Sequence, residues 1–187
     1  MIWENNPDIA YIVCDNQRRV IRKLLDEHRE ERRPYVFCTN TMRTIEKLNR
    51  ILVPVTMLEE EVYKAEICTY LARKTGAHIV LLLANDYGSR AKKNMQRIIT
   101  HIESVAQRTN QPIQYEQHLA IKDSFSVYKE ATQRQRDFGH QLLVMTASRD
   151  YGLDDLIFGA PEQHVIQHSA VPVMLINPRE DLFSLCD

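Results

Sequence analysis

Residues 51–83 read ILVPVTMLEEEVYKAEICTYLARKTGAHIVLLL, and this stretch decides the fold. Two short, mostly apolar runs, at 51–55 and 78–83, flank a segment whose apolar residues recur every three or four positions. Short apolar runs are typical of buried strands, and a spacing of three or four is typical of a helix with one apolar face. Three glutamates suit the positive end of that helix dipole, and Gly76 suits its C-terminal end. The stretch therefore predicts two strands joined by a helix over 59–75.

The same alternation of strands and helices continues toward the end of the chain. The predicted elements are a helix at 90–108, a strand at 113–119, a helix at 124–138, a strand at 141–145, a helix at 162–168 and a strand at 172–176. In the second of these helices we expect Ser124 to be the N-cap and Phe125, Tyr128 and Ala131 to lie on the apolar face. Strands that alternate with helices indicate right-handed crossovers around a parallel sheet. The predicted fold is α/β, an open, Rossmann-like sheet of five parallel strands with helices on both faces.

The beginning of the chain does not fit inside that unit. A strand at 9–14, a helix at 17–33 and a strand at 34–38 form a piece too small to build a core of its own. The order of its strand, helix and strand is the same as at the end of the main unit. Residues 10–14 parallel 141–145, residues 19–22 parallel 164–167, and residues 34–38 parallel 172–176. We therefore expect 1–40 to be the strand-helix-strand remnant of a preceding module, 41–50 a linker, 51–177 the main domain and 178–187 a C-terminal tail.

Composition and charge narrow the classes of function. The 187 residues include 24 Lys and Arg against 25 Asp and Glu, so no net charge attracts nucleic acid or an anionic membrane. The longest apolar run is the length of a strand, and the N-terminus lacks the pattern of a signal peptide. The four cysteines share no C-x-x-C spacing, which is typical of a reducing compartment. We expect a cytoplasmic protein.

Three segments of residues 51–177 resemble the universal stress protein family. They are the opening strand at 51–55 with its helix and Gly76-Ala77, the strand Leu142-Leu-Val-Met145, and the closing GAPEQHVIQHSAVPV at 159–173. The resemblance implies a Rossmann-like α/β domain and a cytoplasmic role in the stress response. It also implies a dimer in which the last strand pairs with its counterpart. Domains of this kind also occur as cytoplasmic tails of bacterial sodium/proton antiporters, which would place the chain at the cytoplasmic face of the inner membrane.

Many members of that family bind ATP through the pattern G-x2-G-x9-G-[ST] and an acidic residue after the first strand. Glycines let backbone N–H groups approach phosphate oxygens. In this chain only the last glycine is present. The matching positions carry Thr146, Arg149, Gly159 and Ala160, and Thr56 replaces the acidic residue beyond Val53. Asp154 and Asp155 add negative charge to the same loop. We expect at most a vestigial nucleotide pocket, with no cofactor and no tight binding of ATP.

Other chemical motifs are weak. His164 and His168 lie four positions apart, a spacing that can bind zinc, but two ligands rarely make a site. No G-x-S-x-G pattern supports a nucleophilic serine, and Asp150 with Asp154 and Asp155 has no partner cluster in the sequence. We predict neither catalytic nor metal-binding residues, and we expect that the protein is not an enzyme.

Three functional hypotheses remain open. The first is a non-enzymatic regulatory module that acts through protein contacts. The second is a nucleotide switch in which Arg149 holds the phosphate. The third is the regulatory tail of an antiporter, with the transporter in the same full-length chain. In each case the short last strand is flanked by proline, as edge strands are. We expect self-association, or an internal pseudo-dimer with the strand at 34–38, through an edge formed by Val173, Met174, Leu175 and Ile176.

Overall fold

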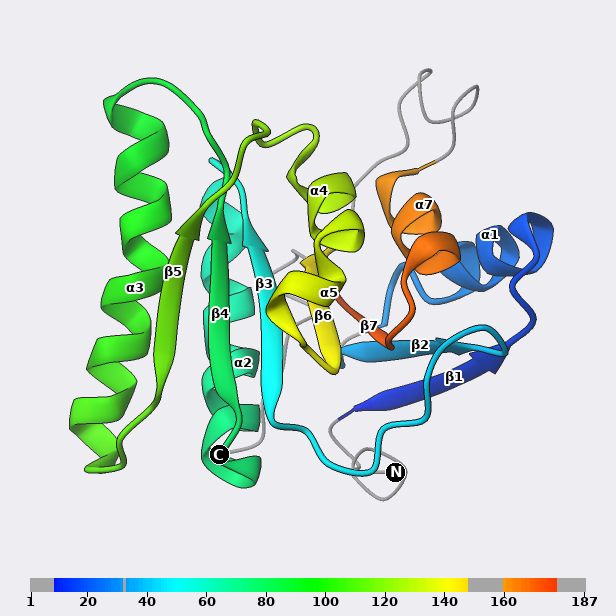
Figure 1. Ribbon diagram of the computed structural model, residues 1–187, viewed down its shortest axis with the longest axis horizontal. Helices are drawn as coiled ribbons and strands as arrows, with labels where there is room; N and C mark the ends of the chain where they lie inside the picture. The colour runs from blue at the N-terminus through cyan, green and yellow to red at the C-terminus, as the bar shows by residue number, and fades with distance from the viewer. Residues whose placement is uncertain (1–8, 32, 148–159, 178–187) are drawn as a thin grey trace.

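The computed structural model describes residues 9–31, 33–147 and 160–177 of the chain. Its centre is one seven-stranded sheet in the order β1-β2-β7-β6-β3-β4-β5 (Figure 1). The strands are β1 (Ala10–Cys14), β2 (Tyr35–Thr39), β3 (Arg50–Val55), β4 (His78–Leu83), β5 (Tyr115–Leu119), β6 (Leu142–Thr146) and β7 (Val173–Ile176). All neighbouring pairs are parallel except β2 and β7, which are antiparallel. The predicted α/β class and the parallel main sheet are confirmed.

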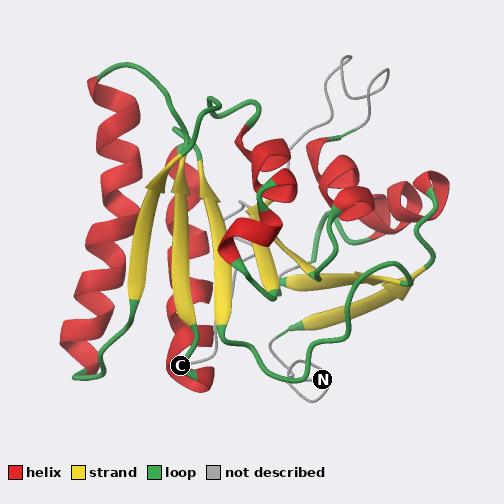
Figure 2. Ribbon diagram, in the orientation of Figure 1, coloured by secondary structure: helices red, strands yellow, loops and turns green. Residues whose placement is uncertain are grey.

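Helices cover both faces of the sheet, as Figure 2 shows. They are α1 (Arg18–Glu27), the 3-10 turn η1 (Glu59–Glu61), α2 (Val62–Thr75), α3 (Ser89–Thr109), α4 (Val127–Gln133), α5 (Gln135–Phe138) and α7 (Pro161–His168). Helix α2 lies behind β3 and β4 and packs against α3, which lies beside the edge strand β5, while α4 and α5 lie in front of the sheet (Figure 1). Helix α7 contacts both α4 and α1, and so links the two ends of the sheet.

Apolar side chains of the central strands form the core. Every residue of β2, β6 and β7 is buried, and so are the side chains of β3 beyond Arg50. Strand β5 lies at one edge of the sheet and alternates between partly buried and exposed residues. Parallel strands with helices on both faces are expected to be apolar throughout, and edge strands are not.

The strand-helix-strand piece at the N-terminus is part of the same sheet. Strand β2 lies against β7, with Tyr35 opposite Leu175, Val36 opposite Met174 and Phe37 opposite Val173. Strand β7 is therefore an interior strand, in contrast to the edge position expected from its flanking prolines. Of the two partners considered for this strand, a second copy of the chain or the strand at 34–38, the structure has the second. Residues 40–49 connect the two parts across the front of the sheet (Figure 1).

The pairing also fixes how the two ends of the chain correspond. A local two-fold axis through the Val36 and Met174 pair relates β2 to β7. Tyr11 lies beside Val36, and Val144 lies beside Met174, so these two residues are equivalent. Residues 10–14 therefore correspond to 143–147. The sequence alignment of 10–14 with 141–145 is wrong by two positions, because short apolar runs carry little register information.

Two predicted helices differ from those observed. Helix α1 ends at Glu27 instead of continuing to position 33, because residues 28–33 offer no apolar side chain to pack. Helix α4 begins at Val127, with Ser126 at the N-cap position. Ser124 is not the cap, and Phe125 lies before the helix with 84% of its surface exposed.

Candidate functional site

The predicted pocket residues lie together at the carboxyl ends of β3 and β6 and the start of α7. Ligands of open α/β sheets bind at this end of the strands. Val53, Thr56, Thr146 and Ala160 are all buried there. Arg149 and Gly159, together with Asp150, Asp154 and Asp155, lie outside the described residues.

A buried ion pair lies directly behind these residues. Lys64 of α2 is fully buried, and its Nζ atom is paired with a carboxylate oxygen of Glu61. The same ammonium group donates to the backbone carbonyl of Pro54 in β3 and lies 3.2 Å from the Tyr128 hydroxyl of α4. The Thr56 hydroxyl donates to the other Glu61 oxygen at 2.9 Å. A closed polar network therefore joins β3 and α2 to α4.

Burial controls the protonation of this network. It lowers the pKa of the Lys64 ammonium, although Glu61 opposes the shift. It raises the pKa of Tyr128 well above its usual range, and Glu61 adds to that effect. Burial also raises the pKa of the Cys68 thiol to about 12, against the attraction of Lys64. Thiols with so high a pKa are poor nucleophiles at neutral pH.

The sequence carries a signal for this network in the spacing of its members. Lys64 lies three residues after Glu61 and four before Cys68, so the helical period places all three on the buried side of α2. Glutamates at the start of a helix also suit the positive end of its dipole, so their presence there does not by itself indicate a buried ion pair. Only the three-dimensional position of Tyr128 shows that the pair is enclosed.

Three loops beyond β3, β4 and β5 are joined by hydrogen bonds. The Ser124 backbone N–H and hydroxyl both donate to the carboxylate of Asp86, and the backbone N–H of Met57 donates to the Ser124 hydroxyl at 2.8 Å. The N–H of Asn85 donates to the carbonyl of Lys122 at 2.8 Å. These bonds connect the three loops to one another.

The buried Glu130 carboxylate supports the same loops from below. It accepts backbone N–H groups of Ile121 and Lys122 and pairs with Arg134 at 2.9 Å. Burial acts to raise the pKa of Glu130, but these donors together hold it below its usual range. The carboxylate is therefore a fixed anchor for the loop after β5.

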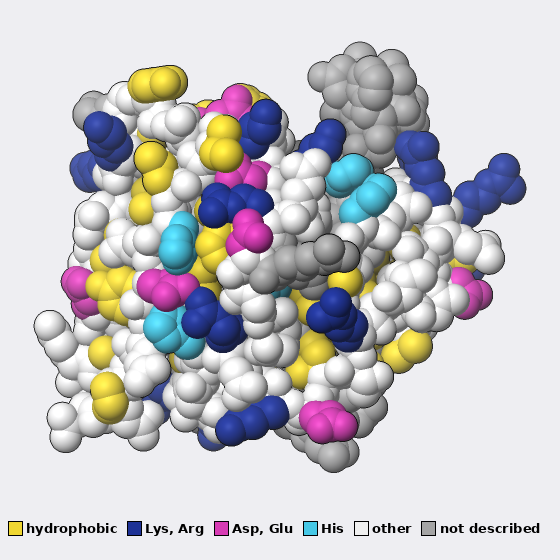
Figure 3. All heavy atoms as spheres, in the orientation of Figure 1, with side chains coloured by type: hydrophobic (Ala, Val, Ile, Leu, Met, Phe, Trp, Pro, Cys, Tyr) yellow, Lys and Arg dark blue, Asp and Glu magenta, His cyan; other side chains and the backbone are white. Residues whose placement is uncertain are grey.

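Large apolar side chains stand out into solvent from this rigid support. Among the described residues, six of the seven exposed large hydrophobic side chains lie here, at the carboxyl ends of β3, β4 and β5. We call them the apolar platform: Met57, Leu58, Tyr87, Leu119, Ile121 and Phe125. Figure 3 shows hydrophobic side chains at this end of the molecule with Lys and Arg side chains beside them.

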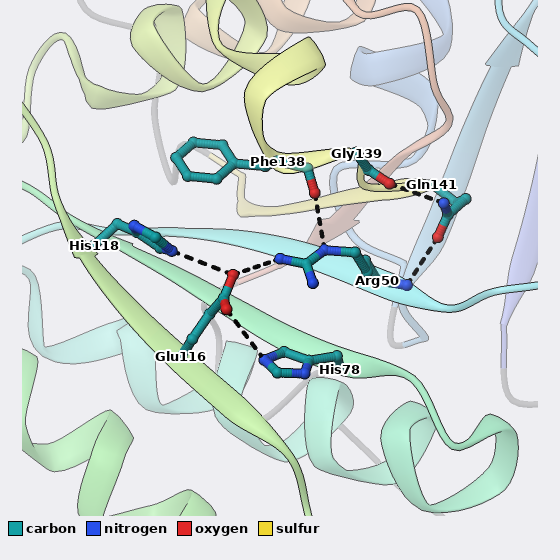
Figure 4. Close-up of polar contacts among 7 residues, drawn as sticks. All are labelled: Arg50, His78, Glu116, His118, Phe138, Gly139 and Gln141. Atoms are coloured by element: carbon teal, nitrogen blue, oxygen red, sulfur yellow. Dashed lines mark hydrogen bonds and ion pairs between the residues drawn. The ribbon is translucent and has the colours of Figure 1, made fainter.

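A second polar cluster lies on the front of β3, β4 and β5 (Figure 4). Glu116 of β5 is paired with Arg50, and its oxygens lie 3.2 Å from His118 Nε2 and 3.6 Å from His78 Nε2. The Arg50 Nε–H also donates to the carbonyl of Phe138 at 2.8 Å. Burial acts to raise the pKa of Glu116, but His118, Arg50 and His78 together lower it.

This cluster ties neighbouring strands to the end of α5. It was missed because its members are far apart in the sequence. The alternation in β5, which places Glu116 and His118 on one face, is the available signal. The cluster contains no nucleophile, and its charges satisfy one another.

The two histidines of α7 lie against each other on one face of the helix. The rings of His164 and His168 stack with centroids 4.1 Å apart, and His168 Nδ1 lies 2.8 Å from the His164 carbonyl oxygen. Within the described ranges, no group of three His, Cys, Asp or Glu side chains is placed to hold a metal ion. No helix in the same ranges is long and apolar enough to cross a bilayer.

An open parallel sheet, helices on both faces and a polar cluster at the carboxyl ends of β3 and β6 define a Rossmann-like α/β domain. Within that class the chain belongs to the universal stress protein family, whose family model matches residues 47–177. The resemblance carried by the sequence motifs is thereby confirmed. No curated protein matches this chain.

Solved structures show the same fold at low sequence identity. A universal stress protein from Archaeoglobus fulgidus DSM 4304 superposes with a TM-score of 0.65 and 17% identity, covering 94% of this chain and 63% of its own. The chain therefore spans less than two thirds of that relative. A universal stress protein in complex with cAMP gives a TM-score of 0.56 at 9% identity, covering 72% of this chain and 100% of its own. A protein of unknown function from Pseudomonas aeruginosa PAO1, PA1789, gives 0.54 at 12% identity, covering 94% and 64%.

Proposed function

We propose that this chain is a non-catalytic regulatory module of the stress response that acts through protein contacts and does not bind ATP tightly. The apolar platform is the observation that carries the proposal. Exposed apolar patches on soluble proteins mark interaction sites, and aromatic side chains dominate binding energy at interfaces. Tyr87 and Phe125 are 92% and 84% exposed, yet the loops that bear them are fixed by internal hydrogen bonds. A surface that is already ordered loses little entropy on binding.

The charge around the platform indicates the kind of partner. Lys92 and Lys93 are exposed in the first turn of α3, which contains no acidic residue, and Lys122 is exposed between Ile121 and the loop that follows. Lysines at a helix N-terminus oppose the helix dipole and are stabilised by external negative charge. The partner is therefore a protein segment with apolar side chains bordered by Asp or Glu.

We expect weak binding of ATP because of the polar network behind the predicted pocket. Thr56 already donates to Glu61, and Lys64 is enclosed by Glu61, Pro54 and Tyr128. The cation that could meet a phosphate is thus neutralised and fully buried. Glu162 adds a second buried carboxylate at the start of α7.

Calorimetric titration tests the nucleotide part of the proposal. With Mg-ATP we expect a Kd weaker than about 1 mM, and the same for cAMP, the ligand of a structurally similar protein. A family member with the intact glycine pattern is the positive control. Micromolar affinity for ATP would overturn the proposal in favour of a nucleotide switch, and micromolar affinity for cAMP alone would make it a cyclic-nucleotide module.

Site-specific crosslinking tests the protein contact. A photoreactive phenylalanine replaces Phe125 in one variant and Arg22, exposed on α1, in the control. We expect a recurring protein adduct from position 125 only, joined through an apolar peptide bordered by Asp or Glu. Lys92→Glu with Lys93→Glu should abolish it. Equal labelling from both positions, or labelling that survives the charge reversal, would contradict the proposal.

A further inference from the structure

Strand β5 has an outer edge that pairs with no other strand of the described residues (Figure 1). The Gln114 carbonyl accepts from the N–H of Ile79 at 2.9 Å, and the Ala120 N–H donates to the carbonyl of Leu83 at 2.7 Å. The even-numbered residues of this segment therefore bond to β4. Because the direction of bonding alternates along a strand, the backbone N–H and carbonyl groups of the odd-numbered residues point to the outer edge. These residues are Tyr115, Gln117 and Leu119.

Helix α3 contacts one face of β5 and leaves its outer residues exposed. The Tyr115 hydroxyl donates to Glu103 of α3 at 2.7 Å, which places the helix on the face that carries the odd-numbered side chains. On the same face Gln117 is exposed, and Leu119 is 67% exposed. The strand has no Pro or Lys, residues that commonly protect sheet edges, and it pairs with β4 without a bulge. Its edge is therefore a template for another strand.

The sequence of β5, Tyr115-Glu-Gln-His-Leu119, is complementary to itself when two copies run antiparallel. With a two-fold axis at Gln117, each copy of this residue lies opposite the other. Tyr115 then lies opposite Leu119 of the second copy, and Glu116 lies opposite its His118. An aromatic ring thus meets an exposed apolar side chain, and a carboxylate meets an imidazole. Cross-strand pairs of these kinds stabilise antiparallel strands.

Backbone and side chains together select this register. Only registers in which odd-numbered residues face odd-numbered ones bring the outward N–H and carbonyl groups together. Among these, an axis at Glu116 would place two carboxylates opposite each other, and an axis at His118 would place two imidazoles so. The axis at Gln117 avoids both and pairs all five residues. Figure 4 shows Glu116 and His118 on one face of β5, where their side chains are 36% and 40% exposed and so accessible to a second copy.

We propose that two copies of this chain associate through β5, antiparallel about a two-fold axis at Gln117, so that their sheets become continuous. The pairing gives the outward backbone groups of β5 their partners and covers Leu119. The seam of β2 and β7 is an antiparallel pairing of the same kind within the chain. The inference goes beyond the proposed function, because it depends on the backbone of β5, and Leu119 is the one residue of the apolar platform within that strand.

Disulfide crosslinking tests the register. In Gln117→Cys the two Cα atoms would lie about 5.5 Å apart across the axis, within the span of a disulfide. In Leu119→Cys, also exposed and on the same strand, they would lie about 14 Å apart, which is too far. Under mild oxidation we expect at least about five times more crosslinked dimer from Gln117→Cys than from Leu119→Cys. The parent chain, which keeps the native cysteines, gives the background.

Sedimentation velocity at protein concentrations from about 5 to 500 μM measures the association itself. Gln117→Pro removes an outward N–H and leaves the bonds to β4, so the fold should persist while the dimer affinity falls at least about tenfold. Val13→Pro is the matched control at the other end of the sheet. The Ala10 N–H donates to Pro34, so the N–H of Val13 likewise points away from its neighbouring strand, β2. This variant should dimerise as the parent does.

Three results would overturn the proposal. They are a parent chain that stays monomeric throughout the concentration range, a folded Gln117→Pro variant that dimerises as tightly as the parent, and equal crosslinking of Gln117→Cys and Leu119→Cys. Circular dichroism establishes that the proline variants are folded. If Gln117→Pro does not fold, the ratio of the two cysteine variants decides, because neither change affects the backbone.

Discussion

The units β1-α1-β2 and β6-α7-β7 have the same architecture but different surroundings. Each consists of two parallel strands joined by one helix, and the local two-fold axis at Val36 and Met174 relates them. Strand β6 lies between β7 and β3 and is buried throughout, whereas β1 pairs with β2 and is the end strand of the sheet that the described residues form. Val13 of β1 is consequently 70% exposed, while its equivalent, Thr146, is buried. The neighbours of a strand, more than its own composition, decide how much of it is buried.

The connections inside the two units also differ. In the first unit, three residues lead from β1 to α1, and Asn16 among them donates to the Gln167 carbonyl of α7 at 3.0 Å and to the Thr41 hydroxyl at 2.9 Å. Gln163 of α7 returns a bond to the Arg18 carbonyl at 2.9 Å. The second unit has a much longer connection, at 147–160. The short connection thus joins the two units to each other, and the long one contains most of the positions that match the family's phosphate pattern in the sequence.

Of the substitutions considered, Met174→Lys should lower the free energy of unfolding most. Met174 is fully buried at the centre of the β2–β7 seam, so the variant places a charge without a partner between the two units. We expect the free energy of unfolding to fall by about 4 kcal/mol or more. Urea unfolding measures it. Val13→Lys, on the exposed side of β1, should change it by less than about 0.5 kcal/mol. Equal losses in both variants would mean that the units do not differ in burial.

The free energy of unfolding should also fall in acid because of a residue next to the second unit, β6-α7-β7. His140 precedes β6, and its folded pKa of about 4 lies below the ordinary 6.5. The unfolded chain therefore binds more protons between these pH values, so stability is complete above pH 6.5 and declines as the pH falls toward 4. The expected loss is about 3 kcal/mol.

His140→Gln should flatten the stability curve over that interval. His101 and His164 also have lowered pKa values and remain in the variant, so the difference between the two curves isolates His140. Protonation of Glu116 and Glu130 changes the stability at lower pH, because the pKa values of both carboxylates lie below 4.5. His168→Gln serves as the exposed control. Parallel curves for the parent and His140→Gln would exclude the assignment.

The smallest effect is expected from the polar bonds that join the two units. The Asn177 amide follows β7 and donates to the carbonyls of His28 and Glu31, at 3.2 and 2.8 Å, just after α1. Asn177→Ala should cost about 1–2 kcal/mol, because two partly buried carbonyl groups lose their donor. Asn40→Ala removes contacts among exposed residues and should cost less than about 0.5 kcal/mol. Thermal unfolding at several scan rates compares them, and a larger loss in the Asn40 variant would reverse the expectation.

The sequence predicted most of the strands because their signal is local. Apolar runs bounded by Gly and Pro located β3, β4, β6 and β7 within two residues, and the unpaired apolar strands at both ends led to the pairing of β2 with β7. The length of α1 was wrong because helix propensity alone cannot sustain residues 28–33 without packing. The start of α4 was wrong because Ser124 bonds to Asp86, which is far away in the sequence.

The candidate site was harder to predict than the fold. The positions of Val53, Thr56, Thr146 and Ala160 followed from the family pattern, and all lie at the expected end of the sheet. The enclosure of Lys64 depends on Tyr128, a contact across 64 positions. Phe125 was predicted to lie on the apolar face of a helix, because apolar spacing alone does not show that this residue lies before the helix and is exposed to solvent.

The antiparallel seam has a consequence for how the chain is made. Tyr35 of β2 contacts Asn177, a residue 142 positions later. At about 5–20 residues per second, the ribosome needs on the order of ten seconds to supply that partner. Throughout this time the five residues of β2, all of which end up buried, have no strand on one side to pair with. Strand β2 is thus synthesised long before the strand with which it pairs, and the nascent chain presents an unpaired apolar strand that a chaperone can hold until β7 emerges.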